Sequence, residues 1–148
     1  MTLPEESNQL SNTRNKNKNP LKIVLVDDEP DVVAFLQTAL EDNGYIALKA
    51  SSAEEGLEIV RREKPALVCL DVLMPQESGV SLYAKIKTDP NLEKIPILIS
   101  SGLNFNRDLK KMFNREKEDG TVISGPENII EKPIDIDQFL AVVRRLTS

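Results

Sequence analysis

Short apolar runs alternate along the chain with longer segments in which apolar residues recur every three or four positions. The short runs are almost continuously apolar, which is typical of strands buried on both faces of a parallel sheet. They predict strands at residues 22–26, 45–48, 66–70, 95–100 and 129–131. The segments between them predict helices that begin near residues 30, 52, 79, 107 and 135. This alternation indicates an α/β fold, with a parallel sheet covered by helices on both faces.

Residues that start and stop helices support these assignments. Pro30 suits a first helical turn, where a missing N–H costs nothing, and Gly44 suits the end of the same helix. Ser52 with Glu55 forms a capping box for the next helix, and Asp135 with Gln138 caps the last one. We interpret Glu29 as an acid at a helix N-terminus rather than as a partner of a metal site.

The first 20 residues have a different composition from the rest. They are rich in Asn, Ser, Lys and Glu, with few sizeable apolar side chains. Such a segment cannot bury enough surface to offset its ordering entropy, so we expect a disordered tail at 1–20 and one domain at 21–148. Within that domain, residues 115–126 contain the turn signals Asp119-Gly120 and Gly125-Pro126, and we interpret them as an insertion.

Composition excludes several classes of function. A net charge of -5 argues against binding to nucleic acid or to an anionic membrane surface. With no His and one Cys, a Cys/His zinc site and an internal disulfide are excluded. No apolar run approaches the length of a membrane span, and the first residues lack the apolar core that is typical of a signal peptide. We therefore expect a cytoplasmic protein whose chemistry depends on carboxylates, Lys and hydroxyls.

Polar residues stand where the predicted strands end. They are Asp27 and Asp28 after the first strand, Asp71 after the third, Ser100 and Ser101 at the fourth, and Lys132 after the fifth. In an open α/β sheet, ligands bind beyond the carboxyl ends of the strands, where the strand order reverses. If the order is 2-1-3-4-5, all these groups meet in one crevice.

Three carboxylates in one crevice repel each other. At a separation of about 4 Å and an effective dielectric near 20, each pair costs roughly 4 kcal/mol. Such a site either raises a carboxyl pKa or holds a cation, and oxygen ligands favour a hard ion such as Mg²⁺. Lys132 and a Ser hydroxyl nearby could clamp a phosphoryl group, whose transfer needs positioning and charge neutralisation. A carboxylate can itself be the nucleophile.

The ordered set of motifs resembles the response-regulator receiver family of two-component signalling. The motifs are residues 26–30 (VDDEP), residues 71–75 (DVLMP) with Gly79, Ser101-Gly102 and Lys132-Pro133, and the resemblance runs from about residue 21 to 146. It implies a doubly wound, flavodoxin-like sheet of five parallel strands in the order 2-1-3-4-5, and Mg²⁺ as cofactor.

The resemblance also implies a role for each matching residue. Asp71 would accept the phosphoryl group, Asp28 would bind Mg²⁺ directly, and Asp27 would bind it through a water molecule. Asp71 and the backbone carbonyl of Leu73 would complete the protein ligands.

Two further residues would handle the phosphoryl group. Ser101 would be the switch hydroxyl, with Ser100 as the alternative, and Lys132 would pair with the phosphoryl group from a cis Lys132–Pro133 segment. The chain departs from the family at Ile129, where an aromatic switch residue usually stands. The insertion at 115–126 borders a face that the family often uses for partners, and we expect it to reshape that face.

The resemblance predicts a phosphoacceptor signalling domain rather than an enzyme. A sensor histidine kinase or a histidine phosphotransfer protein would supply the phosphoryl group, and an unknown downstream protein would be contacted in trans. A receiver-like binding module that needs no phosphorylation is the alternative, favoured by Ile129 and the insertion but opposed by the complete acidic site. A haloacid-dehalogenase-like phosphatase fits poorly, because Leu73 stands where that family has a second Asp.

Overall fold

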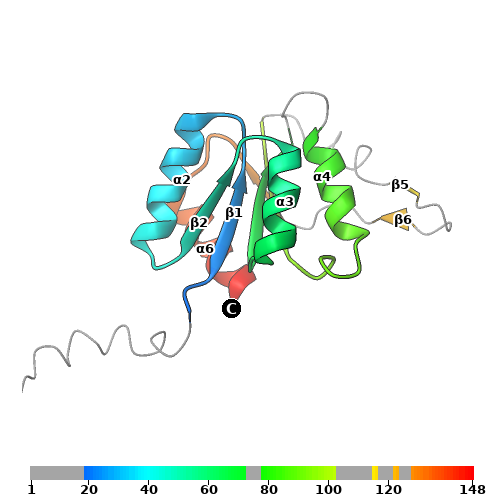
Figure 1. Cartoon of the computed structure of the whole chain (residues 1–148). Helices are drawn as coiled ribbons and strands as arrows, with labels where there is room; N and C mark the ends of the chain where they lie inside the picture. The colour runs from blue at the N-terminus through cyan, green and yellow to red at the C-terminus, as the bar shows by residue number, and fades with distance from the viewer. Residues whose placement is uncertain (1–18, 73–77, 103–114, 117–121, 124–127) are drawn as a thin grey trace, which may run out of the picture.

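The structure is a computed structural model that describes residues 19–72, 78–102, 115–116, 122–123 and 128–148. Its centre is a five-stranded parallel sheet with the order β2-β1-β3-β4-β7 (Figure 1). The strands are β1 (Lys22–Val26), β2 (Ile46–Ala50), β3 (Leu67–Asp71), β4 (Ile97–Ser101) and β7 (Asn128–Glu131). Because β7 is the fifth strand of this sheet along the chain, the predicted order 2-1-3-4-5 is confirmed.

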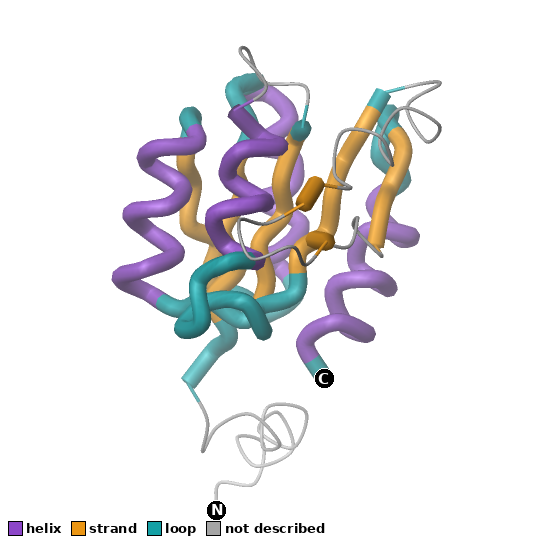
Figure 2. Tube along the Cα trace, turned by 90° about the vertical axis from the view of Figure 1, so that its right-hand side faces the viewer, coloured by secondary structure: helices purple, strands orange, loops and turns teal. Residues whose placement is uncertain are grey.

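Helices cover both faces of the sheet. They are α2 (Pro30–Asp42), α3 (Ala53–Glu63), α4 (Ser78–Lys87) and α6 (Ile136–Thr147). In Figure 2, α6 lies on the opposite side of the strands from α3 and α4. None of the helices in the described part of the chain is long and apolar enough to span a bilayer.

Two apolar cores lie on the two sides of the sheet. The core beneath α3 and α4 includes Val24, Val26, Val68, Leu70, Ile97, Ile99, Val60, Leu82 and Ile86. The core beneath α2 and α6 includes Ile23, Leu25, Leu67, Cys69, Leu98, Leu36, Leu40, Phe139 and Val143. Successive side chains of a strand point to opposite faces, so each continuous apolar run supplies both cores.

The predicted helix caps are present. Ser52 Oγ accepts a hydrogen bond from the Glu55 backbone N–H at 3.2 Å, and Asp135 Oδ1 accepts one from the Gln138 N–H at 3.0 Å. The Glu55 carboxylate reaches back to the N–H of Ser51 at 2.8 Å rather than to that of the N-cap residue itself. Gly44 follows the end of α2 with φ of 88°, in the left-handed region that favours glycine.

Some predicted boundaries move by one or two residues. The second strand begins one residue later than predicted. It ends two residues later because it includes Lys49, which interrupts the apolar run but is exposed on an edge strand. The third and fourth strands begin one and two residues later than predicted, and each ends one residue later, so that they include Asp71 and Ser101. The predicted helix near 107–114 and residues 1–18 of the predicted tail lie outside the described residues.

Residues 115–126, the predicted insertion, contain two very short strands. These are β5 (Arg115–Glu116) and β6 (Val122–Ile123), which pair in an antiparallel manner and form a second, two-stranded sheet. Sequence periodicity did not predict them, because a strand of two residues carries no alternation that can be recognised.

Candidate functional site

The carboxyl ends of β1 and β3 bring three carboxylates together. Asp27 and Asp28 directly follow β1, and Asp71 is the last residue of β3. These three residues each offer a carboxylate oxygen, and the oxygens lie within 4.8 Å of one another. The two strands are neighbours in the sheet, in parallel register, which is why residues far apart in the sequence meet at this edge.

The three carboxylates differ in their exposure to solvent. Asp27 and Asp71 are 6% and 3% exposed, whereas Asp28 faces solvent. A buried carboxylate needs a partner to offset its loss of hydration. Lys132 provides one: its Nζ lies 3.4 Å from Asp27 Oδ2 and 3.3 Å from Asp71 Oδ2.

Lys132 reaches the carboxylates from the segment after β7. Its backbone N–H donates to the carbonyl oxygen of Ser101 at 2.7 Å, which extends the pairing of β4 and β7 by one more bond. The peptide bond between Lys132 and Pro133 is cis, as expected. The Lys132 side chain also pairs with Glu29, at 3.0 Å from Nζ to Oε1.

Burial and charge shift two pKa values in this site. Burial is the main cause that raises the pKa of Asp27 to about 6, and the charge of Asp71 adds to it, while the Glu29 N–H and Lys132 act in the opposite direction. Burial lowers the pKa of Lys132, but its hydrogen bond to Glu29 and the charges of Asp71 and Asp27 outweigh that and raise it. The site therefore carries more negative charge than Lys132 alone can balance.

A hard divalent cation fits this donor set. All the converging atoms are carboxylate oxygens, which Mg²⁺ and Ca²⁺ prefer. A hollow of about 340 Å³ opens beside them, lined in part by Asp27, Asp28, Pro30 and Ser51, and it leaves room for water ligands. The predicted ligand Leu73 lies outside the described residues.

Ser101 ends β4 in full burial. Its Oγ has no hydrogen-bond partner among the residues that the structure describes. A buried hydroxyl without a partner costs about 1–3 kcal/mol, so it stands out from the other polar atoms of the interior. Ser100, the alternative, is aligned with Asp71 in the sheet and lines a narrow space beside Leu98, Ile130 and Phe139.

Ile129 lies in β7 with its side chain 36% exposed, whereas the next residue, Ile130, is buried in the core beneath α2 and α6. The position at which the family usually has an aromatic switch residue is therefore aliphatic and partly open to solvent.

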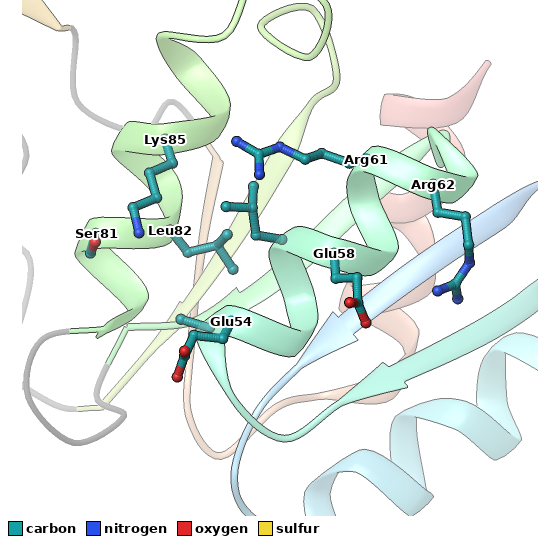
Figure 3. Close-up of a pocket in the computed structure, with 9 residues that line it drawn as sticks. Glu54, Glu58, Arg61, Arg62, Ser81, Leu82 and Lys85 are labelled. Carbon is teal, nitrogen blue, oxygen red and sulfur yellow. The ribbon is translucent and has the colours of Figure 1, made fainter.

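A second groove lies between α3 and α4, away from the carboxylates (Figure 3). It measures about 490 Å³, and Leu57 and Leu82 line it together with charged residues of both signs. Arg61 and Lys85 reach over it from opposite helices, while Arg62 points away and pairs with Glu63. In the described part of the chain, the acidic group of Asp27, Asp28 and Asp71 is the cluster suited to a metal ion, so the groove is not the candidate site.

Comparison with known proteins decides the family. The model of the response regulator receiver domain matches residues 23–144. The chain belongs to the response regulator receiver family. Receiver domains act in two-component signalling. The family resemblance and the flavodoxin-like fold that the sequence predicts are both confirmed.

Curated relatives agree with this assignment. The response regulator Rre1 of Synechocystis is 30% identical over 128 residues, which are 86% of this chain and 52% of Rre1. Protein PilH of Pseudomonas aeruginosa is 27% identical over 82% of this chain and 93% of PilH. The chain thus spans about half the length of Rre1 and nearly all of PilH.

Solved receiver structures have the same fold. The receiver domain of a histidine kinase from Syntrophus aciditrophicus superposes with a TM-score of 0.72 and 28% identity, covering 86% of this chain and 89% of that chain. The chemotaxis response regulator CheY4 of Vibrio cholerae superposes with a TM-score of 0.71, covering 86% of this chain and 98% of CheY4; at 20% identity this supports the fold alone.

Sequence reasoning missed one contact of the receiver site. The sequence predicts Glu29 as a helix N-terminal acid, and it is indeed the N-cap residue of α2, but its side chain makes no capping hydrogen bond. Instead, its carboxylate lies nearer to Lys132 Nζ than those of Asp27 and Asp71 do. No local pattern links two residues that are 103 positions apart, so only the folded chain reveals this pair.

Proposed function

We propose that this receiver domain accepts a phosphoryl group on Asp71 from a sensor histidine kinase or a histidine phosphotransfer protein. The observation that carries the proposal is the set of charged groups around the Asp71 carboxylate. Its carboxylate is buried, its oxygen lies 3.3 Å from Lys132 Nζ, and Asp27 and Asp28 offer oxygens within 4.8 Å. A carboxylate in this setting needs no general base, which suits a chain without His.

The transfer is a substitution at phosphorus. An Asp71 carboxylate oxygen forms a bond to the phosphorus atom as the bond to the donor nitrogen of phosphohistidine breaks, and the nitrogen keeps the electron pair. The product on the protein is an acyl phosphate, which adds negative charge beside two other acids. Lys132 lies where it can balance that charge, since its ammonium already contacts Asp71.

The remaining residues support this reaction in the proposal. Asp28 and Asp71 would hold Mg²⁺ directly, Asp27 would hold it through water, and the carbonyl of Leu73 would complete the protein ligands. When bound, Mg²⁺ neutralises phosphoryl oxygens during transfer. Ser101, with its unpartnered buried hydroxyl, donates a hydrogen bond to the phosphoryl group and so couples phosphorylation to β4.

The proposed output is protein–protein contact. The domain acts as a switch in the cytoplasm, as is typical of response regulators, and it assists only its own phosphorylation and dephosphorylation. Residues 115–126 lie between the switch serine and Lys132 in the sequence, and in the proposal they reshape the surface that a downstream protein reads.

Incubation with Mg²⁺ and acetyl phosphate tests the proposal. Intact-mass measurement is expected to show one added phosphoryl group on the wild type and none on Asp71→Asn or in the presence of EDTA. Asp31→Asn serves as the matched control, because Asp31 is an exposed acid in the first turn of α2. An unmodified wild type, or equal modification of Asp71→Asn, would refute the assignment.

Phosphorylation-independent binding is the second candidate, and Ile129 favours it, because no aromatic ring stands there to report on the site. Under this alternative, a partner binds the wild type and Asp71→Asn equally, with or without acetyl phosphate. A difference between those states excludes it.

A further inference from the structure

Lys132 is shared among three carboxylates, two of them buried and one exposed. Its Nζ lies 3.0 Å from Glu29, 3.3 Å from Asp71 and 3.4 Å from Asp27. The nearest of the three, Glu29, is not part of the group suited to a metal ion, and its side chain is 59% exposed. Lys132 thus bridges the buried carboxylates and an acid at the outer rim of the site.

A divalent cation and Lys132 would compete for the same carboxylates. Asp27 and Asp71 accept hydrogen bonds from Lys132, and both belong to the group that could hold the ion. Two positive charges that share carboxylates repel each other, and this repulsion is strong where water is excluded. Lys132 is itself only 19% exposed, so if it left both buried acids it would still need an acceptor.

Glu29 is held where it can supply that acceptor. Its backbone N–H donates to Asp27 Oδ1 at 2.9 Å, and its carbonyl accepts from Val33 N–H at 3.1 Å, so its backbone is fixed at the start of α2. Its side chain makes no capping bond and is therefore available to Lys132. The backbone bond to Asp27 ties Glu29 to the acids that would bind the ion.

We propose that Glu29 is a positioning residue that draws Lys132 toward the rim of the site, so that a divalent cation can occupy Asp27, Asp28 and Asp71. The inference rests on the proposed function, which assigns the ion to these acids. In the structure, Lys132 contacts all three partners. As the ion binds, the pairs of Lys132 with Asp27 and Asp71 weaken and the pair with Glu29 retains the ammonium near the place where a phosphoryl group arrives.

A double-mutant cycle separates this role from a simple loss of negative charge. The Mg²⁺ dissociation constant of the full chain is measured by calorimetry at one pH and low ionic strength. The variants are Glu29→Gln, Lys132→Met, both together, and the matched control Asp31→Asn alone and with Lys132→Met. Asp31 lies in the first turn of α2 and carries the same charge as Glu29, and its side chain makes no hydrogen bond or ion pair with the described residues.

The expected result is a coupling between residues 29 and 132. Glu29→Gln should weaken Mg²⁺ binding about threefold or more beyond the effect of Asp31→Asn when Lys132 is present, and no more than Asp31→Asn in the Lys132→Met background. Equal effects of the two substitutions in both backgrounds, or tighter Mg²⁺ binding by Glu29→Gln, would overturn the inference.

The same experiment distinguishes failure of this inference from failure of the proposed function. Wild-type protein that binds Mg²⁺ but shows no coupling between residues 29 and 132 refutes the positioning role alone. Wild-type protein that binds no Mg²⁺ removes the metal from the proposed function, and the role of Glu29 falls with it.

Discussion

Two adjacent acids, Asp27 and Asp28, have opposite environments. Asp27 is buried beside Asp71 and has a pKa raised to about 6, whereas Asp28 is exposed. The backbone at the end of β1 places one side chain inward and the next outward. One carboxyl group therefore titrates near neutral pH while its neighbour offers a solvent-accessible oxygen to an incoming ion.

The raised pKa of Asp27 predicts a stability change with a defined sign. The folded state binds the Asp27 proton more tightly than the unfolded state does. The stabilisation from this proton is therefore lost as pH rises from about 4 to about 6, so the free energy of unfolding falls over that range. The loss is complete above pH 6. Without divalent ions at pH 7.5, Asp27→Asn should raise the free energy of unfolding by about 1–3 kcal/mol, and by less at pH 5.

Urea unfolding in EDTA at the two pH values measures this effect, with Asp31→Asn as a control that should change little. Excess Mg²⁺ should make the wild type more stable than Asp27→Asn, because the wild type then gains binding energy that Asp27→Asn lacks. A less stable Asp27→Asn protein in EDTA at pH 7.5 would show that the pair with Lys132 outweighs the burial of Asp27.

At the residue scale, the sequence was sufficient to predict that the three acids and the lysine meet at one edge of the sheet, because each directly follows a predicted strand. The contact between Glu29 and Lys132 was not predictable, since it depends on a side-chain direction that no local pattern determines. The roles proposed for the three acids and the lysine, and for Leu73, stay predictions.

At the scale of elements, the start of α4 presses against the end of β3. A Cβ atom on Gly79 would lie 2.6 Å from the carbonyl oxygen of Asp71 and 2.7 Å from the Cα of Val72. These neighbours are backbone atoms and cannot rotate aside. Gly79 therefore allows α4 to begin against the strand that carries the proposed phosphoacceptor.

Replacement of Gly79 by Ala should be destabilising although Ala favours helices by about 1 kcal/mol. We expect a loss of roughly 1–3 kcal/mol, together with weaker Mg²⁺ binding, because the end of β3 must shift. Gly56→Ala is the comparison: its Cβ would meet side-chain atoms of Val26 and Leu82 at 3.0 and 3.1 Å, which can adjust, so its loss should be smaller and Mg²⁺ binding retained. Urea unfolding and calorimetry measure both effects; a Gly79→Ala protein as stable as the wild type would contradict the packing argument.

The described helices and the five main strands were predictable because caps and apolar runs mark them locally, whereas the helix predicted near residue 107 lies outside the described residues. Ser52 and Asp135 cap α3 and α6 as their sequence context indicates. The pair β5 and β6 was missed because two-residue strands are defined by their partner and not by their own composition. The motif at Gly79 was recognised, but the close approach to Asp71 that explains it required the structure.

At the scale of the whole molecule, the sheet separates two cores and holds the acidic site at one edge. The strand order was predictable from the family resemblance, since the alternation of strands and helices alone leaves several orders open. Because the acids come from two strands and Lys132 from a third, the site exists only in the folded chain. An ion that binds there must therefore stabilise the fold.

Mg²⁺ should raise the melting temperature of the wild type through this linkage. At a free Mg²⁺ concentration about 100 times the dissociation constant, the gain in the free energy of unfolding is about 2.7 kcal/mol. Differential scanning fluorimetry should show a concentration-dependent shift for the wild type and Asp31→Asn and a much smaller one for Asp28→Asn. Equal shifts in all three proteins would point to non-specific ion effects.

Cys69 gives the molecule an internal probe. It is the single cysteine of the chain, it lies in β3 at the centre of the sheet, and burial raises its pKa to about 12. Its side chain lies in the core beneath α2 and α6, so a thiol reagent can modify it only when that core opens. The labelling rate would therefore measure how often this core opens over the strand that ends in Asp71, without any engineered reporter.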